Sequence, residues 1–361
     1  MNYIWSKKSL LEFLNESINK VVWNWKYKFS DLFAWTWIVW RYFKSKWHPI
    51  IANDLQYYSY VLNKNYIENN KILEFKGLEK DIPEIKNISS KSWLRTKKIL
   101  EYLNKLNWIE WFIYKNYSEG WTKNQEFVRL YFTDRNAKRT DAIRQKIEKW
   151  KNKNKITENE YFFLLASLIE AIDKVANTAS VYGAFLKKIK KSAEKDLILE
   201  EAKFDLDNLE HKVYNKDINK LVLEIENEVV YLDPPYNHRQ YGWNYHLLET
   251  IAKYDNPKIR GKTGTRVDPD KKSTYCSKVE VKKSFEDLIT NIKADYIFLS
   301  YNDEWIMSLD EIKEIMSKRW KYGVFKKEYR RFKADKTENR NHKKTSVIEY
   351  LHYVKVNKEN N

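Results

Sequence analysis

The chain is nearly free of cysteine, since Cys276 is the only one among its 361 residues. This excludes a disulfide framework or a cysteine-based metal site within one chain, and it fits a reducing cytoplasm. Long hydrophobic runs are also absent. The most apolar stretch, residues 161–172, is too short to span a bilayer and carries Glu170. The N-terminal residues mix charges into their apolar positions, so we expect no secretory signal and no membrane association.

Glycine is scarce and tryptophan is abundant. The chain has 7 glycines and 15 tryptophans, whereas average usage of about 7% would give roughly 25 glycines. Glycine allows tight turns and close approach of the backbone to a ligand, so its scarcity needs an explanation. The stretch SDLFAWTWIVW at 30–40 places Trp35, Trp37 and Trp40 where a buried strand should turn into a helix.

Positive charge is in excess, with 67 Lys and Arg against 50 Asp and Glu and a formal net charge of +17. Such an excess favours a polyanionic partner, because neutralised phosphates release their counterions. A lysine-rich composition inherited from an A/T-rich genome explains the same excess. Charge alone therefore leaves nucleic acid as one of two interpretations.

Apolar periodicity predicts an α/β protein that is interrupted by a helical segment. Helix and strand patterns alternate at the start of the chain, which indicates a parallel sheet: helix 8–21, strand 26–35, helix 38–47, strand 48–55 and helix 56–71. Strand patterns return later, with one helix between them: strands 211–218, 228–236 and 294–304, helix 245–255, and a closing antiparallel pair at 322–332 and 346–356.

The middle of the chain has a different character. It is polar and mostly helical in period, with helices predicted at 141–156 and 158–191, the second long or broken near Asn177. We therefore predict a discontinuous catalytic domain, residues 1–66 and 213–361, and an inserted, mainly helical domain, residues 67–212, that recognises a large anionic substrate.

The stretch EVVYLDPPYNHRQYG at 228–242 is the most informative in the chain. An apolar strand ends in Asp233-Pro234-Pro235-Tyr236, and open α/β sheets bind ligands outside the carboxyl ends of their strands. The prolines fix φ and remove two N–H donors, so the turn is stiff and its carbonyls are left as acceptors. A carboxylate, a rigid carbonyl and an aromatic face suit a planar ring with an amino group. A plain strand end with a tight Pro-Pro turn is the alternative.

The stretch resembles the DPPY motif of S-adenosylmethionine-dependent amino methyltransferases, which act on adenine N6 or cytosine N4. The resemblance implies that Asp233 and the carbonyl of Pro234 accept hydrogen bonds from the exocyclic amine, while Pro235 stiffens the turn and Tyr236 stacks on a flipped base. Such chemistry needs no metal.

A second motif of the family is altered in this chain. Relatives carry a cofactor loop similar to D-L-F-A-G-T-G-x-V-G, whereas residues 31–40 read DLFAWTWIVW, with tryptophan at each glycine position. The N-terminal motif Y-I-G-S-K likewise reads YIWSK at 3–7. One hypothesis covers both: UGA codons that the native system reads as glycine are written here as tryptophan. If the tryptophans are real, Trp35 and Trp37 fill the cofactor site.

The resemblance covers nearly the whole chain and is strongest to the Dam-like (D12) class of DNA adenine N6-methyltransferases from restriction-modification systems. It implies a Rossmann-like methyltransferase sheet and a set of S-adenosylmethionine contacts: Tyr3, Trp5, Lys7, Phe33, Ala34, Trp35, Thr36, Trp37, Asp54, Asp217 and Ile218. Plain structural roles are the alternatives, namely a surface lysine at Lys7, a helix N-cap at Asp54 and a loop residue at Asp217.

The same resemblance implies contacts with DNA. Candidates lie in the insert and directly after the DPPY motif: Arg135, Lys138, Arg139, Arg144, Asn177, Tyr182, His238 and Arg239. A solvated basic helix face is the alternative for the insert residues. Residues 258–275 are rich in lysine and glycine and suit a loop that closes on DNA, although a plain surface loop fits as well.

These observations favour a site-specific DNA adenine N6-methyltransferase that protects double-stranded DNA from an independently acting restriction endonuclease. We expect a cytoplasmic monomer or weak dimer, without a fused nuclease after residue 355. The alternatives are cytosine N4 or ribosomal RNA adenine methylation, or a catalytically inactive DNA-binding protein if the tryptophans are real. The target sequence is not readable from these residues.

Overall fold

The structure is a computed structural model that describes residues 7–35, 37–235, 240–267, 272–302, 306–330 and 346–357. The chain divides into two compact units. The sheet unit holds Tyr3–Tyr60, Leu209–Tyr241 and Asp270–Asn361, and the helical unit holds Val61–Asn208 and Gly242–Pro269. That residues 67–212 form an inserted recognition domain stays a prediction, and the helical unit also takes in chain from beyond the DPPY motif.

In the described part of the sheet unit, one seven-stranded sheet has the order β3-β2-β1-β4-β7-β9-β8. Its strands are β1 (Phe29–Asp31), β2 (Ile50–Asn53), β3 (Lys212–Tyr214), β4 (Val229–Leu232), β7 (Tyr296–Asn302), β8 (Trp320–Arg330) and β9 (Ser346–Val356). The strands from β3 to β7 run parallel, and β8 and β9 complete the sheet as an antiparallel pair. The α/β class, the mostly parallel sheet and the closing antiparallel pair are thus confirmed.

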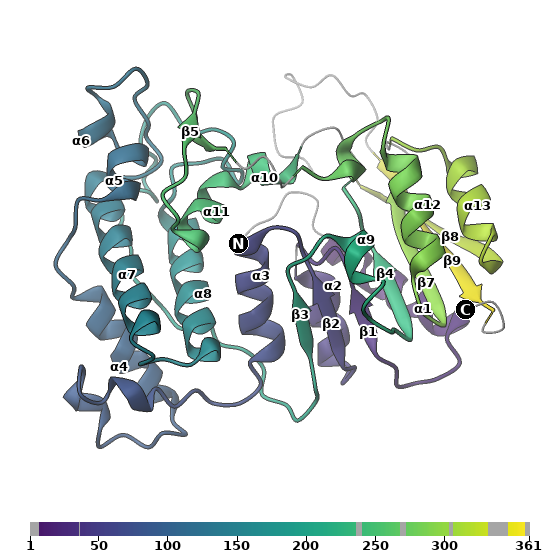
Figure 1. Ribbon diagram of the computed structural model, residues 1–361, viewed down its shortest axis with the longest axis horizontal. Coiled ribbons are helices and arrows are strands. Elements are labelled where there is room, and N and C mark those ends of the chain that lie inside the picture. Colours follow the sequence, from purple (N-terminus) through teal and green to yellow (C-terminus); the bar gives the residue numbers. More distant parts are fainter. Residues whose placement is uncertain are drawn as a thin grey trace. The chain divides into compact units, whose positions relative to one another are not determined.

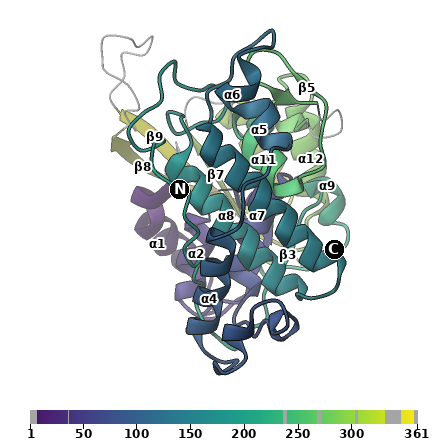
Figure 2. The same cartoon turned by 90° about the vertical axis from the view of Figure 1, so that its left-hand side faces the viewer.

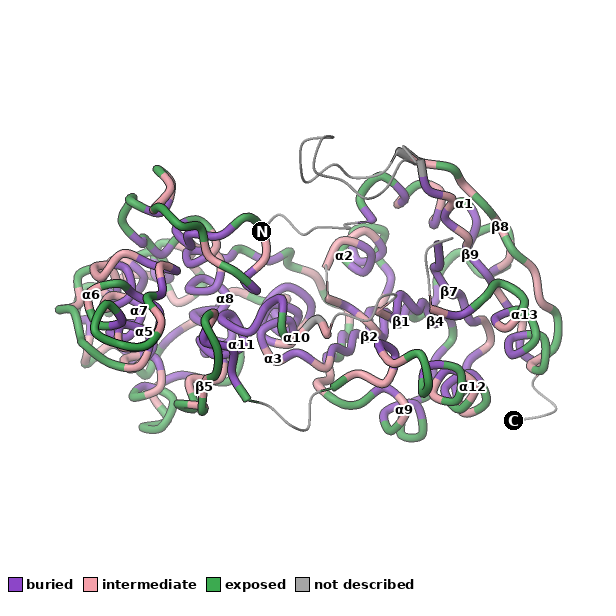
Figure 3. The backbone as a smooth tube through the Cα atoms, turned by 90° about the horizontal axis from the view of Figure 1, so that it is seen from above, coloured by how far each residue is buried: buried purple, intermediate pink, exposed green. Residues whose placement is uncertain are grey.

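Helices cover both faces of this sheet, which explains why β1, β2 and β4 are buried at every position. The helices of this unit are η1 (Lys7–Leu10), α1 (Leu11–Val21), α2 (Ile38–Ser45), α9 (Ile218–Leu221), η5 (Thr274–Cys276), α12 (Val281–Asn291) and α13 (Leu309–Ser317). Helices α1 and α2 lie on one face, and α9, α12 and α13 lie on the other (Figures 1 and 3). Phe285, Leu288 and Ile312 pack into the core on the second face.

The helical unit is built around α7 (Asp134–Asn152) and α8 (Glu158–Val175), which pack side by side (Figure 2). Its other elements are η2 (Lys64–Glu68), η3 (Lys76–Leu78), η4 (Pro83–Ile85), α4 (Trp93–Asn104), α5 (Phe112–Tyr117), α6 (Glu119–Thr122), α11 (His246–Lys253), β5 (Ile259–Arg260) and β6 (Thr265–Arg266). Two further helices lie across the division between the units, α3 (Tyr57–Asn63) and α10 (Tyr241–Asn244). No described helix is long and apolar enough to cross a membrane.

Helix α8 ends close to the break that the sequence allows. Thr157 and Glu160 form a capping box at its start. The helix ends at Val175, so the predicted break near Asn177 is confirmed, and the alternative of one long helix to residue 191 is wrong. The side-chain amide of Asn177 donates to the carbonyls of Leu130 and Leu186, and these bonds hold the following chain in a non-helical path.

Three tryptophans have backbone conformations that suit glycine better than a residue with a side chain. Trp37, Trp47 and Trp320 have φ values of 51°, 65° and 129°, and residues with a Cβ rarely adopt such angles. Trp47 is also 64% exposed. Trp40 and Trp150, in contrast, are only 1% exposed and pack as core residues. The geometry therefore supports glycine at some tryptophan positions and gives others the surroundings of a real tryptophan.

Replacement of Trp47 by glycine should raise the free energy of unfolding by about 1 kcal/mol, because the left-handed backbone no longer strains against a Cβ. Urea denaturation measures this change. The matched control is Trp150→Gly, which removes a buried ring and its 2.7 Å hydrogen bond to Asp81, and should lower the free energy by about 3 kcal/mol or more. Equal destabilisation by both substitutions would contradict the dihedral argument.

Candidate active site

The order of the sheet reverses between β1 and β4, because the chain adds β2 and β3 on one side and β7 on the other. Asp31 ends β1 and pairs in register with Tyr231, which lies two residues before Asp233. In open parallel sheets, a crevice outside the carboxyl ends of the strands forms at such a reversal, and ligands bind there. The fold therefore places Asp233, Pro234 and Pro235 of the DPPY motif at this crevice.

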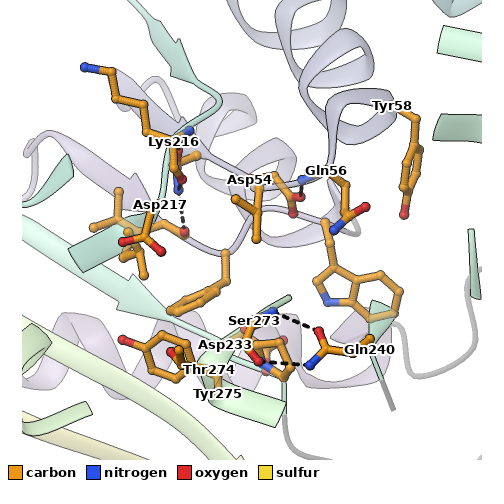
Figure 4. Close-up of a pocket in the computed structure, with 17 residues that line it drawn as sticks. Asp54, Gln56, Tyr58, Lys216, Asp217, Asp233, Gln240, Ser273, Thr274 and Tyr275 are labelled. Carbon is orange, nitrogen blue, oxygen red and sulfur yellow. Dashed lines mark hydrogen bonds between the residues drawn. The ribbon is translucent and has the colours of Figure 1, made fainter. Parts of the chain in front are cut away.

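A pocket with a volume of about 740 Å³ lies at this point, within the sheet unit. Its walls come from the ends of β1, β2 and β4, the start of α9 and the segment before α12 (Figure 4). The lining residues include Phe33, Trp35, Asp54, Gln56, Tyr58, Lys216, Asp217, Ile218, Asp233, Pro235, Gln240, Ser273 and Tyr275.

Asp233 is the most unusual group of the pocket. Its side chain is buried, and burial raises its pKa to about 6, although the Lys7 ammonium lowers it. Lys7 Nζ lies 3.5 Å from Asp233 Oδ1. Among the residues that the structure describes, no donor makes a hydrogen bond to that buried oxygen. A buried acceptor without such a bond is costly, and active sites are where this cost is retained.

Acidic groups dominate this edge of the sheet. The pKa of Asp31 is raised well above its usual range, first by burial and then by the charge of Asp233. Asp54 and Asp217 also line the pocket. The cations that the described residues contribute are Lys216, in the lining, and Lys7, beside Asp233. The site therefore favours a ligand that carries positive charge.

The two acidic residues at the rim also have local structural roles. Asp54 Oδ1 accepts a hydrogen bond of 2.6 Å from the backbone N–H of Gln56, and Asn215 holds the Asp54 carbonyl at 2.6 Å. Asp217 caps α9 by accepting from the N–H of Lys220 at 3.3 Å. These contacts fix both carboxylates beside the pocket, so a capping role and a ligand-binding role are compatible.

Several pocket residues were not found from the sequence. Gln240 and Ser273 exchange two hydrogen bonds: Gln240 Nε2 donates to the Ser273 carbonyl at 3.0 Å, and the Ser273 N–H donates to Gln240 Oε1 at 2.8 Å. Tyr275 packs edge-on against Phe33, with 5.2 Å between ring centroids. Gln240 lies in the stretch that contains the DPPY motif, and Ser273 and Tyr275 lie in the segment 258–275 that was singled out as a loop, but no signal assigned any of them to the pocket.

The structure brings together most of the described residues that were predicted to bind the cofactor. Phe33, Trp35, Asp54, Asp217 and Ile218 line the pocket. Three others have neighbouring positions: Ala34 donates its N–H to the Asn53 carbonyl, Lys7 lies beside Asp233, and Trp37 is the N-cap of α2. Other predicted residues lie outside the described part of the chain: Tyr3, Trp5, Thr36, Tyr236, His238 and Arg239. The roles of all these residues stay predictions.

The predicted DNA contacts in the helical unit divide into two groups. Arg144, Asn177 and Tyr182 are buried, and the Arg144 guanidinium donates to the carbonyls of Ile251 and Ala252. Such burial supports structural roles for these three.

The second group is closer to the surface of the unit. Arg135 pairs with Asp196 at 2.7 Å, Lys138 pairs with Glu110 at 2.6 Å, and Arg139 donates to the Leu197 carbonyl at 3.0 Å. Exposed ion pairs break at little cost, so a role of these side chains in DNA binding stays a prediction.

Comparison with known proteins agrees with this geometry. The family model described as D12 class N6 adenine-specific DNA methyltransferase matches residues 3–316. The Type II methyltransferase M.NlaIII of Neisseria lactamica is 48% identical over 98% of this chain and 99% of its own length. The chain belongs to the D12 class of N6 adenine-specific DNA methyltransferases.

Two further relatives show how widely the sequence is shared. The Type II methyltransferase M.CviAII of Paramecium bursaria Chlorella virus 1 is 33% identical over 99% of this chain and 98% of its own length. The Type II methyltransferase M.FokI of Planomicrobium okeanokoites is 37% identical over 98% of this chain, which corresponds to 52% of the relative. No solved structure matches the chain.

The buried arginine gives a test of the structural roles in the helical unit. Arg144→Ala should lower the free energy of unfolding by about 3 kcal/mol or more, because it leaves the carbonyls of Ile251 and Ala252 without this donor and removes the ion pair with Glu148. Lys138→Ala, on the same helix, should change it by less than about 0.5 kcal/mol. Urea denaturation of both variants measures the difference. A small effect at Arg144 would show that its buried contacts are dispensable.

Proposed function

We propose that this protein transfers a methyl group from S-adenosylmethionine to N6 of a flipped adenine in double-stranded DNA. The observation that carries the proposal is the buried Asp233 carboxylate, which ends β4 beside a pocket at the reversal of the sheet. Membership of the adenine-specific family agrees with it.

The pocket residues fit a positively charged cofactor. The carboxyl groups of Asp54, Asp217 and Asp233 in the pocket lining favour a cation over an anion. S-adenosylmethionine would supply an activated methyl group on a sulfonium, whose charge matches this excess. Phe33 and Ile218 offer apolar surface for a nucleobase, while the carboxylates of Asp54 and Asp217 suit hydroxyl and amino donors.

The protein's part in the reaction is to position an amine. The lone pair of an exocyclic amine is delocalised into the base ring, so the nitrogen is a poor nucleophile. Asp233 and the Pro234 carbonyl would accept its two N–H groups, favour a pyramidal nitrogen and stabilise the positive charge that develops on it. Burial of Asp233 strengthens this interaction, since water does not screen it.

DNA is the substrate that the relatives support. The relatives described above are Type II methyltransferases, so we assign this chain the modification role of a restriction-modification system. The cognate endonuclease would act independently on the same site. The large helical unit and the net charge of +17 suit a long polyanion better than a small substrate.

The tryptophan at position 35 favours a second possibility, a DNA-binding protein without activity, because its indole lines the cofactor pocket. We propose instead that positions 35 and 37 are glycine in the native protein. Trp37 has a left-handed backbone and occupies an N-cap without a capping hydrogen bond from its side chain. Glycine suits both features.

Restoration of glycine at 35 and 37 should enable cofactor binding. We expect Trp35→Gly with Trp37→Gly to raise the affinity for S-adenosylmethionine by about tenfold or more, measured by isothermal titration calorimetry, because the pocket loses an indole and α2 gains a relaxed N-terminus. Trp47→Gly, away from the pocket, is the control and should leave the affinity unchanged. Tight binding by the unaltered chain would refute the glycine hypothesis at these positions.

Loss of the Asp233 carboxylate should abolish methyl transfer while leaving the cofactor bound. In the chain with glycine at 35 and 37, Asp233→Asn should lower the single-turnover rate on duplex DNA by about 100-fold or more, since an oriented acceptor is lost. Transfer of radiolabelled methyl groups, followed by nucleoside analysis for N6-methyladenine, provides the measurement. A variant with undiminished transfer, or label on cytosine, would overturn the proposed function.

A further inference from the structure

Lys7 is a buried ammonium between two buried carboxylates of the sheet unit. Lys7 Nζ lies 2.5 Å from Glu349 Oε1 and 3.5 Å from Asp233 Oδ1. The exposed fractions of the three side chains are 6%, 0% and 8%. A buried cation is costly unless it is fully paired, so this arrangement ties η1 to the residue that follows β4 and to a residue within β9.

Glu349 is itself held in place on both sides. It lies on β9 opposite Asn302 of β7 and Lys327 of β8. Ser300 Oγ donates to Glu349 Oε1 at 2.5 Å, and the Tyr329 hydroxyl donates to Oε2 at 3.4 Å. The carboxylate therefore has a fixed position and sets the position of Lys7.

The two distances differ in a way that matters for function. At 2.5 Å, Lys7 makes a hydrogen bond with Glu349, whereas at 3.5 Å its interaction with Asp233 is mainly electrostatic. Lys7 thus supplies positive charge to Asp233 while its hydrogen-bonding capacity is directed to Glu349. The Asp233 carboxylate keeps its capacity to accept a hydrogen bond from a ligand.

We propose that Lys7, held by Glu349, is a positioning residue that keeps Asp233 ionised and able to accept a hydrogen bond from the target amine. This role rests on the proposed function and differs from the contact with the cofactor that the resemblance implies for Lys7. It is carried by the contacts of the described side chains, with no ligand involved.

The electrostatic surroundings show why Asp233 needs a cation. The described ionisable groups that interact with it are Lys7 from η1, Asp31 from β1, Tyr231 from β4, Tyr329 from β8 and Glu349 from β9. Burial raises the Asp233 pKa to about 6, Lys7 lowers it and Glu349 raises it. The carboxyl is therefore mainly ionised at pH 7, with a small margin.

Protonation of Asp233 at neutral pH would change its carboxyl group from a hydrogen-bond acceptor into a donor. A protonated carboxyl has an O–H that donates, and the amine of adenine presents N–H groups that need an acceptor. Without Lys7, burial and the neighbouring carboxyl groups would raise the pKa of Asp233 above neutral pH. The structure therefore predicts the direction of each change. Removal of Lys7 should move the acidic limb of the pH–rate profile to higher pH, and removal of the Glu349 charge should move it to lower pH.

The test compares Lys7→Met, Lys7→Arg and Glu349→Gln with Lys8→Met, a matched control because Lys8 is exposed on the same turn. All four are made in the full chain with glycine at 35 and 37. Single-turnover methylation is measured from pH 5 to 9 with saturating S-adenosylmethionine and duplex DNA.

We expect Lys7→Met to move the acidic limb up by about one pH unit or more, since an opposite charge at this range shifts a pKa by 1–3 units. Glu349→Gln should move it down, Lys7→Arg should restore most of the parent profile, and Lys8→Met should match the parent. The dissociation constant of S-adenosylmethionine should change less than about twofold in Lys7→Met, because the lysine acts on Asp233.

Two results would overturn the proposal. One is a limb that stays in place in Lys7→Met while cofactor affinity falls, which would assign Lys7 to the cofactor. The other is a shift of the same sign in Lys7→Met and Glu349→Gln, which would reflect general damage to the site.

A readout without turnover separates this proposal from the proposed function. The Asp233 side chain is titrated by carboxyl ¹³C NMR, assigned with Asp233→Asn. If the parent protein does not methylate DNA, the proposed function fails, and the titration still decides whether Lys7 sets the Asp233 charge. Thermal melting of each variant shows whether it folds. If Lys7→Met does not fold, the pH profiles of Lys7→Arg and Glu349→Gln are compared with that of the parent protein instead.

Discussion

A negative charge kept out of water at the end of β4 is the constraint on which the site depends. The parallel strands leave no solvated face there, so Asp233 is enclosed between β1, β7 and the helices that cover the sheet. Enclosure makes the carboxylate a strong acceptor and also makes its ionised form costly. The nearby ammonium of Lys7, itself fixed by a third buried charge, resolves that conflict.

The reversal of strand order explains why this charge lies beside a cavity. Chain that leaves β1 turns toward β2, and chain that leaves β4 turns toward β7, so the connections diverge above the sheet. The walls of the resulting hollow come from five separate stretches of sequence.

Much of the fold could be predicted because its signals are local. Strands β2 and β4 are short apolar runs, and β8 and β9 alternate, so pattern and composition identified them. The end of α8 was predicted only as one of two alternatives, because the apolar period continues past Val175 and the bonds that redirect the chain involve the carbonyls of Leu130 and Leu186. Helices α12 and α13 were missed, although both have an apolar face toward the sheet.

The site was predictable to the extent that it follows a contiguous motif. Asp233 and Phe33 were found because each lies in a short stretch with recognisable chemistry. The partnership of Lys7 with Glu349 joins residues 342 positions apart, and only the antiparallel return of β9 brings them together. The resemblance implies a cofactor contact for Lys7, and no feature of the sequence indicates the strand register that places Glu349 beside it.

The mutual hydrogen bonds of Gln240 and Ser273 have an architectural consequence. These bonds join the point where the chain leaves the sheet unit after β4 to the point where it returns before α12. The two ends of the segment 242–269, which belongs to the helical unit, are therefore held together. A segment whose ends are held together can change in length at small entropic cost. Such changes are confined to the parts outside α11, because Leu247, Leu248 and Ile251 are buried and Arg144 donates to the carbonyls of Ile251 and Ala252.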